Sequence, residues 1–153
     1  MDHKFIKSPE KRKIISELQE KFGISEIPYL LIESGKEKIR AFSGSLSKDE
    51  ILEIAKLTRI EGIGLYILKN EHDELRLSFD ATQILAKQIT KNIIDIDKEQ
   101  LELWIRGHDL VLKAPKGTFA IRYNNDFLGC GKSNGEKIFN YVPKERRIKK
   151  PLN

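Results

Sequence analysis

The sequence predicts an α+β protein, with a small N-terminal α+β domain followed by a β-barrel that carries short helices. Helix and hairpin signals alternate over the first sixty residues, whereas glycine-punctuated runs of strand length dominate the last forty. No linker rich in Gly, Ser or Pro separates the two patterns. The 153 residues suffice for one domain or two small ones. We place the domains at residues 1–72 and 73–153.

A helix is expected to begin at Ser8-Pro9, with Ser8 as the cap and Pro9 at the first helical position. Gly23 ends it, because glycine readily adopts the left-handed conformation that terminates helices. Its apolar residues recur at helical spacing and define one buried face: Ile14, Ile15, Leu18 and Phe22.

The rest of the N-terminal domain is predicted to form a β-hairpin and a second helix. Residues 27–33 and 38–42 are short strand candidates, joined by a turn at 34–36. Ser47 followed three residues later by Glu50 is a capping box, which predicts a helix starting there. The helix would line its inner side with Ile51, Ile54, Ala55 and Thr58.

Beyond residue 60, strand and helix signals continue in short segments. Alternating apolar residues at 63–68 predict a strand. The polar stretch 70–73 predicts a turn, and Leu75 with Leu77 predicts the strand that returns from it. A helix capped by Ser78 or Asp80 follows and presents Ile84, Leu85 and Ile89.

The last third contains a short strand at 92–96 and a helix capped by Asp97 that places Leu101, Trp104 and Ile105 on one face. Gly107 ends this helix. Three strand candidates come next, at 117–123, 126–130 and 137–142. Their turns fall at Asn124-Asn125 and at Ser133-Asn134-Gly135, residue types that tolerate positive φ angles.

The positive charge of the chain is concentrated at its C-terminal end. Residues 141–153 hold five basic side chains against one acid, and so carry +4 of the net +5. Such a local cluster is typical of phosphate binding. The alternative is a disordered tail that aids solubility. Tyr141, Val142 and Ile148 interleave apolar groups with the charges, which favours a tail that packs in part on the barrel.

Composition narrows the class of protein. No apolar run reaches the roughly 18 residues of a membrane span, and residues 1–13 lack the apolar core of a signal peptide, so we expect a cytoplasmic protein without membrane contact. The single cysteine, Cys130, excludes an internal disulfide and an all-cysteine metal site. No phosphate-binding loop, zinc-binding or nucleophile motif is present, so we expect neither enzymatic activity nor a cofactor.

The order of elements resembles the PUA domain, an RNA-binding module named after pseudouridine synthases and archaeosine transglycosylases. Asn92–Asp97, Arg106–Leu110, Pro115 with Gly117, and Phe127–Gly131 carry the resemblance. The stretch Asn140–Arg147 is similar to the end of archaeal PUA proteins related to Sun-type RNA methyltransferases and ribosome-maturation factors. The resemblance covers about half of the chain, residues 73–150. It implies a PUA-like barrel behind a pre-PUA N-terminal domain.

The resemblance also implies where RNA would bind. In the family, RNA is held along the glycine-ended helix, the adjoining strand and the tail. One departure is Lys116, which stands between the proline and the glycine of the family's turn. Together with the basic tail, the resemblance gives these RNA-binding candidates: Arg106, Gly107, His108, Lys113, Lys116, Lys132, Lys144, Arg146, Arg147, Lys149 and Lys150.

Several of these features have simpler explanations. Gly107 is explained as a helix terminator, His108 as a surface histidine and Cys130 as a small buried side chain. The aromatic residues Tyr123, Phe127, Phe139 and Tyr141 either fill the barrel or, where exposed, stack on bases.

We therefore expect a non-catalytic RNA-binding protein that acts in rRNA or tRNA maturation or modification, and that loses RNA affinity but keeps its fold when residues 144–153 are removed. Its expected partner is RNA, with an RNA-modification enzyme or a pre-ribosome as a further partner. The alternative is a protein-interaction adaptor in a ribosome-assembly or RNA-modification complex, and a hydrolase or transferase is the third reading. Steep salt dependence of binding separates RNA binding from adaptor docking.

Overall fold

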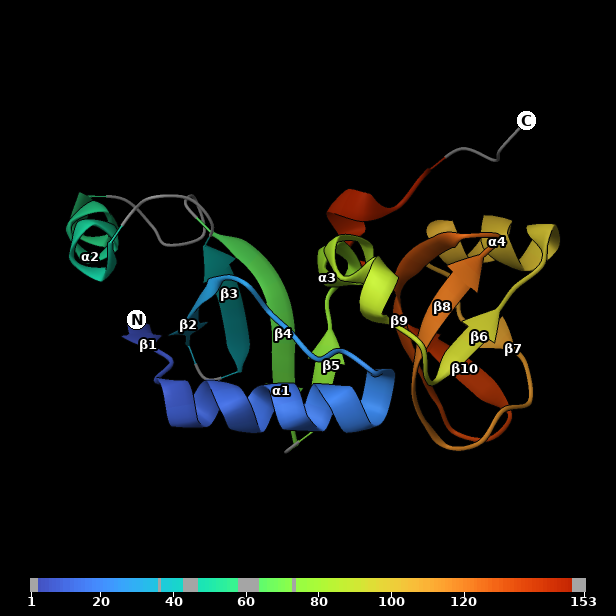
Figure 1. Ribbon diagram of the computed structural model, residues 1–153. Coiled ribbons are helices and arrows are strands. Elements are labelled where there is room, and N and C mark those ends of the chain that lie inside the picture. The colour runs from blue at the N-terminus through green and yellow to red at the C-terminus, as the bar shows by residue number, and fades with distance from the viewer. Residues whose placement is uncertain (1–2, 36, 43–46, 58–63, 73, 150–153) are drawn as a thin grey trace.

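The computed structural model describes residues 3–35, 37–42, 47–57, 64–72 and 74–149. It confirms the α+β class (Figure 1). The elements in chain order are β1 (His3–Phe5), α1 (Ser8–Phe22), β2 (Leu30–Ser34), β3 (Lys38–Phe42), α2 (Lys48–Leu57), β4 (Leu65–Glu71), β5 (Glu74–Leu77), α3 (Phe79–Ile84), the 3₁₀ turn η2 (Ala86–Gln88), β6 (Ile93–Asp95), α4 (Lys98–Ile105), β7 (Leu110–Val111), β8 (Gly117–Tyr123), β9 (Asp126–Ser133), β10 (Lys137–Asn140) and the 3₁₀ turn η3 (Lys144–Arg146).

The first sheet is antiparallel and has the strand order β1-β2-β3-β4-β5. Helix α1 lies along one side of it in Figure 1. The helix buries Leu18 and Phe22 completely, as their helical spacing predicts. It ends at Gly23, whose φ of 86° lets its N–H bond back to the last turn.

The second sheet has the strand order β6-β8-β9-β10-β7 and curls into a half-barrel (Figure 1). Strand β6 runs parallel to β8, and the other pairs are antiparallel. The turn between β8 and β9 has Asn124 at a φ of 54°, which confirms the predicted tight turn. Helix α4 lies against this sheet through Trp104, whose Nε1 donates to the Leu128 carbonyl at 2.7 Å.

Two main clusters of buried side chains hold these elements together. The first joins Phe22 of α1 and Leu77 of β5 to Ala120 and Cys130 of the second sheet. The second lies within the half-barrel around Trp104. Because β4 and β5 are a paired hairpin, the first sheet crosses the predicted boundary between residues 72 and 73. The division into two domains there stays a prediction.

The first residues of the helices test the capping residues that the sequence predicts. Ser47 and Glu50 form the expected capping box, with bonds of 3.2 and 3.3 Å. For α3, Ser78 rather than Asp80 is the cap, since its Oγ accepts the Ala81 N–H at 3.0 Å. For α1, Ser8 is not the cap: Lys7 takes that position without a side-chain bond, and Ser8 is already helical.

Other expectations on elements need correction. Ile84 is 44% exposed, because α3 ends there and the chain tightens into η2, which turns this side chain outward. The strand predicted at 137–142 ends at Asn140. The short strands β1 and β7 carried no clear sequence signal. The expectations for Lys36, Thr58, Ile63, Asp73 and Lys150 lie outside the described residues, as do those for the side chains of Ile54 and Ala55.

Within the described part of the chain, no helix combines the length and the apolar character that crossing a membrane requires.

Candidate nucleic-acid interface

The candidate site begins at the C-terminal end of α4. Asp97 caps this helix through the Gln100 N–H, and Gln100 returns a bond to the Asp97 N–H, so the start of α4 is fixed. At its other end, Gly107 has a φ of 92°. This left-handed residue turns the chain sharply and leaves Arg106 and His108 exposed on either side.

The basic tail returns to this glycine. The Ile148 N–H donates to the Ile105 carbonyl at 2.8 Å, which ties the tail to the end of α4. Arg147 Nε donates to the Val142 carbonyl at 2.9 Å and lies directly over Gly107. A Cβ atom at position 107 would come within 2.5 Å of that Nε. Gly107 therefore ends the helix and also makes room for the arginine.

A single asparagine joins the end of α4 to β10. Asn140 Nδ2 donates to the carbonyls of Trp104 and His108 at 2.8 and 2.9 Å. Its Oδ1 accepts the Val142 N–H at 2.7 Å. Val142 is buried, so the expectation that part of the tail packs on the barrel is confirmed.

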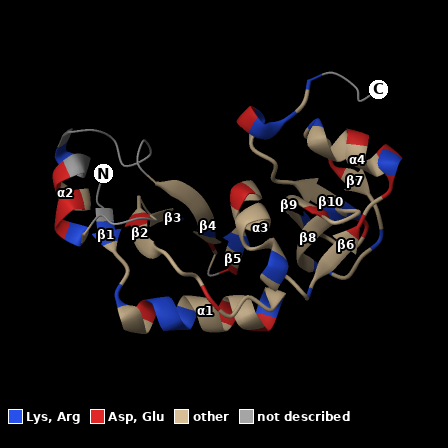
Figure 2. Ribbon diagram, turned by 45° about the horizontal axis from the view of Figure 1, so that its top comes forward, with Lys and Arg blue, Asp and Glu red and all other residues tan. Residues whose placement is uncertain are grey.

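These contacts form an open groove of about 620 Å³ between the helix end and the tail. Its lining contains four basic side chains, His108 and one acid. The lining residues are Arg106, His108, Lys144, Glu145, Arg147, Ile148 and Lys149. We call this the tail groove. Figure 2 shows the tail lying beside α4.

Three of the four cations that line the tail groove are available to a ligand. Within the part of the chain that the structure describes, no ion pair involves Arg106, Lys144 or Lys149. All three are exposed. Unpaired, exposed cations on both sides of a groove bind phosphate without first giving up another partner.

The other candidates lie elsewhere. Lys113 and Lys116 flank a loop fixed to the β9–β10 turn, since the Ala114 carbonyl accepts the Ser133 hydroxyl at 3.0 Å. That loop lies at the opposite end of the second sheet from the tail in Figure 1. Lys132 pairs with Glu74 at 3.5 Å and Arg146 with Asp80 at 3.0 Å. Lys150 is outside the described residues. The predicted set is thus one groove plus separate cations.

Cys130, Asp95 and Asp97 are chemically capable side chains whose surroundings the structure describes. Burial raises the pKa of Cys130 to about 12, so its thiol stays protonated. Asp95 forms a two-bond pair with Arg122, and the hydrogen bond from Arg122 lowers the pKa of its carboxyl. Asp97 is a helix cap. Among the described residues, no group of acids, histidines and cysteine is arranged to hold a metal ion.

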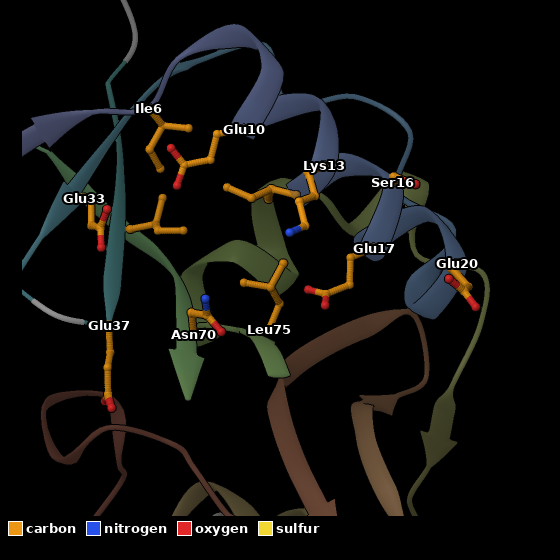
Figure 3. Close-up of a pocket in the computed structure, with 12 residues that line it drawn as sticks. Ile6, Glu10, Lys13, Ser16, Glu17, Glu20, Glu33, Glu37, Asn70 and Leu75 are labelled. Atoms are coloured by element: carbon orange, nitrogen blue, oxygen red, sulfur yellow. The ribbon is translucent and has the colours of Figure 1, made fainter. Parts of the chain in front are cut away.

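Sequence reasoning missed a second hollow, of about 640 Å³, beneath α1 (Figure 3). Five glutamates and one lysine supply its charged lining: Glu10, Glu17, Glu20, Glu33, Glu37 and Lys13. They come from α1, β2 and the β2–β3 turn, so only the fold brings them together. This hollow has the opposite charge to the tail groove and would repel phosphate.

A family model matches the part of the chain that contains all of the tail groove except Lys149. Residues 91–148 match the family model described as the PUA domain of the methyltransferase RsmF. The chain is 27% identical over 88 residues to the ribosomal RNA small subunit methyltransferase F of Vibrio vulnificus, and 27% identical over 89 residues to that of Vibrio cholerae. Each match covers 57% of this chain but 19% of the relative.

Residues 91–148 therefore correspond to a PUA domain. More particularly, this region is related to the PUA domain of Sun-type RNA methyltransferases, as the sequence motifs indicated. The expectation of archaeal relatives is corrected, because the matched proteins come from bacteria. The chain spans about a fifth of the length of these relatives.

Proposed function

We propose that this chain binds RNA through the tail groove of its PUA domain and acts in ribosomal RNA maturation. The observation that carries the proposal is the groove itself, where cations that form no ion pair with the described residues stand on both sides, one at the glycine-ended helix and two on the tail. Arg106 and the backbone near Gly107 would position a phosphate, with Lys144 and Lys149 neutralising its neighbours. The relatives' name favours ribosomal RNA over transfer RNA as the ligand.

We further propose that the chain contributes binding rather than catalysis. Its candidate nucleophile is buried with a raised pKa, and its neighbouring acids serve in an ion pair and a helix cap. The region shared with the methyltransferases is their PUA domain. An RNA-modification enzyme or a pre-ribosome remains a proposed partner, and the cytoplasm the proposed location.

The structure changes the best test of the tail. Removing residues 144–153 would delete the Ile148–Ile105 bond and uncover Gly107, so lost affinity could reflect a loosened fold. Substitution in place avoids this problem. Lys144→Gln with Lys149→Gln removes two charges that no ion pair holds among the described residues.

We expect this double variant to bind ribosomal RNA fragments more weakly and with less salt dependence. Each lost phosphate contact lowers the slope of log affinity against log salt by about 0.7 for single strands. The matched control, Lys4→Gln with Lys7→Gln, removes the same charge from exposed positions near the N-terminus and should retain the slope. Fluorescence anisotropy at several salt concentrations measures both quantities. Equal affinity of the double variant and the parent at low salt would contradict RNA binding through the tail groove. Salt-insensitive binding to a protein would support the adaptor alternative.

A further inference from the structure

Two aromatic rings at the end of β10 are exposed: Phe139 lies in the strand, and Tyr141 is the first residue after Asn140, where β10 ends. Phe139 and Tyr141 alternate with the buried residues Ile138 and Val142, and are 37% and 36% exposed. Among the described residues, neither ring belongs to a cluster of buried side chains, whereas Trp104 and Phe127 do. The fold therefore does not require these two rings for its interior.

Cations accompany both rings. Lys137 Nζ lies 5.3 Å from the centre of the Phe139 ring, and Lys132 is the cross-strand partner of Phe139. The Arg76 guanidinium lies 3.7 Å from the centre of the Tyr141 ring, so it covers one face of that ring. We call Phe139, Tyr141, Arg76, Lys132 and Lys137 the β10 platform.

The two lysines of the β10 platform pair with acids that a ligand could replace, whereas Arg76 pairs with Glu71 at 3.3 Å and is largely buried. Lys137 pairs with Asp109 at 3.2 Å and Lys132 with Glu74 at 3.5 Å. Both lysine side chains are more than 40% exposed. Exposed pairs of this kind contribute little stability, so exchange of a carboxylate for a phosphate costs little.

We propose that the β10 platform stacks the bases of unpaired RNA nucleotides. Residues two apart in an extended chain are separated by roughly 6.8 Å, which would let the rings of Phe139 and Tyr141 each meet one base of an unpaired RNA strand. Base-paired RNA keeps its bases stacked on each other and offers no free ring face, so the platform selects single-stranded segments. This inference rests on the proposed RNA binding and adds the class of RNA recognised.

The test compares a labelled unstructured RNA oligonucleotide with a hairpin duplex of equal length. We expect Phe139→Ala and Tyr141→Ala each to weaken single-strand binding roughly tenfold, the order expected for loss of one stacked base. Duplex binding should change little. The salt slope should also stay constant, because no phosphate contact is removed. The matched control is Leu103→Ala, which truncates an exposed apolar side chain on α4.

Two further variants separate stacking from apolar docking. Phe139→Leu keeps an apolar side chain but loses the ring face, so it should bind single strands as weakly as Phe139→Ala. Phe139→Trp should retain binding, and its fluorescence should be quenched by RNA while that of the buried Trp104 changes little. Circular dichroism verifies folding.

The outcomes distinguish this inference from the proposed function. If Lys144→Gln with Lys149→Gln weakens RNA binding but Phe139→Ala does not, base stacking by the β10 platform is overturned. RNA binding through the tail groove is then supported. Equal losses for single strand and duplex, or full binding by Phe139→Leu, would also overturn the platform and point to a protein-docking face. Absence of RNA binding by the parent at low salt would overturn both proposals.

Discussion

At the scale of single residues, two separate constraints favour glycine at position 107. Its φ of 92° disfavours any residue with a side chain, and the Arg147 guanidinium occupies the space where a Cβ would lie. The sequence indicated only the first constraint, because a glycine after a helix predicts a left-handed turn. The second arises from a residue forty positions later.

We predict that Gly107→Ala lowers the free energy of unfolding by more than the roughly 1 kcal/mol that left-handed alanine costs. The excess comes from displacing Arg147. Gly135→Ala is the matched control, since Gly135 has a φ of 106° and open space around it. Urea unfolding measures both. Equal losses would show that the arginine moves aside freely, and adding Arg147→Ala should then change nothing.

At the scale of elements, the joint between α4 and β10 determines the geometry of the tail groove. The Asn140 side chain donates to the carbonyls of Trp104 and His108, before and after the end of α4. Asp109 accepts the Asn140 N–H at 2.8 Å. Local patterns gave the bounds of α4 and of the strands to within a few residues. They did not show that an asparagine in NYVP links them, because its partners lie 32 and 36 positions away.

We predict that Asn140→Ala destabilises the protein by about 1–3 kcal/mol, through carbonyls left without donors. Asn140→Asp should be at least as harmful, because it keeps the acceptor for Val142 but faces two carbonyls with a carboxylate. Thermal unfolding measures the loss, and RNA anisotropy measures its effect on the groove. Wild-type stability of Asn140→Asp would contradict the assigned donor roles.

At the scale of the whole molecule, Glu74 links the two sheets. It lies on β5, accepts from Lys21 of α1 at 2.7 Å and from Thr118 of β8 at 2.6 Å, and also pairs with Lys132 of β9. The Lys21 hydrogen bond, followed by that of Thr118, lowers the pKa of Glu74 to about 2. Helix α1 and the β8–β9 hairpin, both distant from Glu74 in the sequence, therefore share its carboxylate.

Because the folded-state pKa is lowered, the stabilisation by Glu74 is complete above about pH 4.5 and is lost as the pH falls towards 2. We predict that Glu74→Gln costs about 1 kcal/mol at pH 7, a value reduced for solvent screening of this partly exposed group. The difference from the parent should vanish near pH 2. Urea midpoints across this range measure it, with the exposed Glu136→Gln as control. A stability difference between the parent and Glu74→Gln that does not change with pH would show that the shape of the Glu74 side chain, and not its charge, stabilises the fold.

The sequence by itself determined the α+β class, most helix and strand positions and the PUA relationship, because these depend on local periodicity, caps and turn residues. It also located the basic tail and predicted that part of it packs. The tertiary structure decided which cations share a groove. Lys113 and Lys116 fall at the far end of the sheet, Arg146 and Lys132 take acidic partners, and Phe139 and Tyr141 face outward. These outcomes depend on strand register and on contacts between distant residues, which no local pattern encodes.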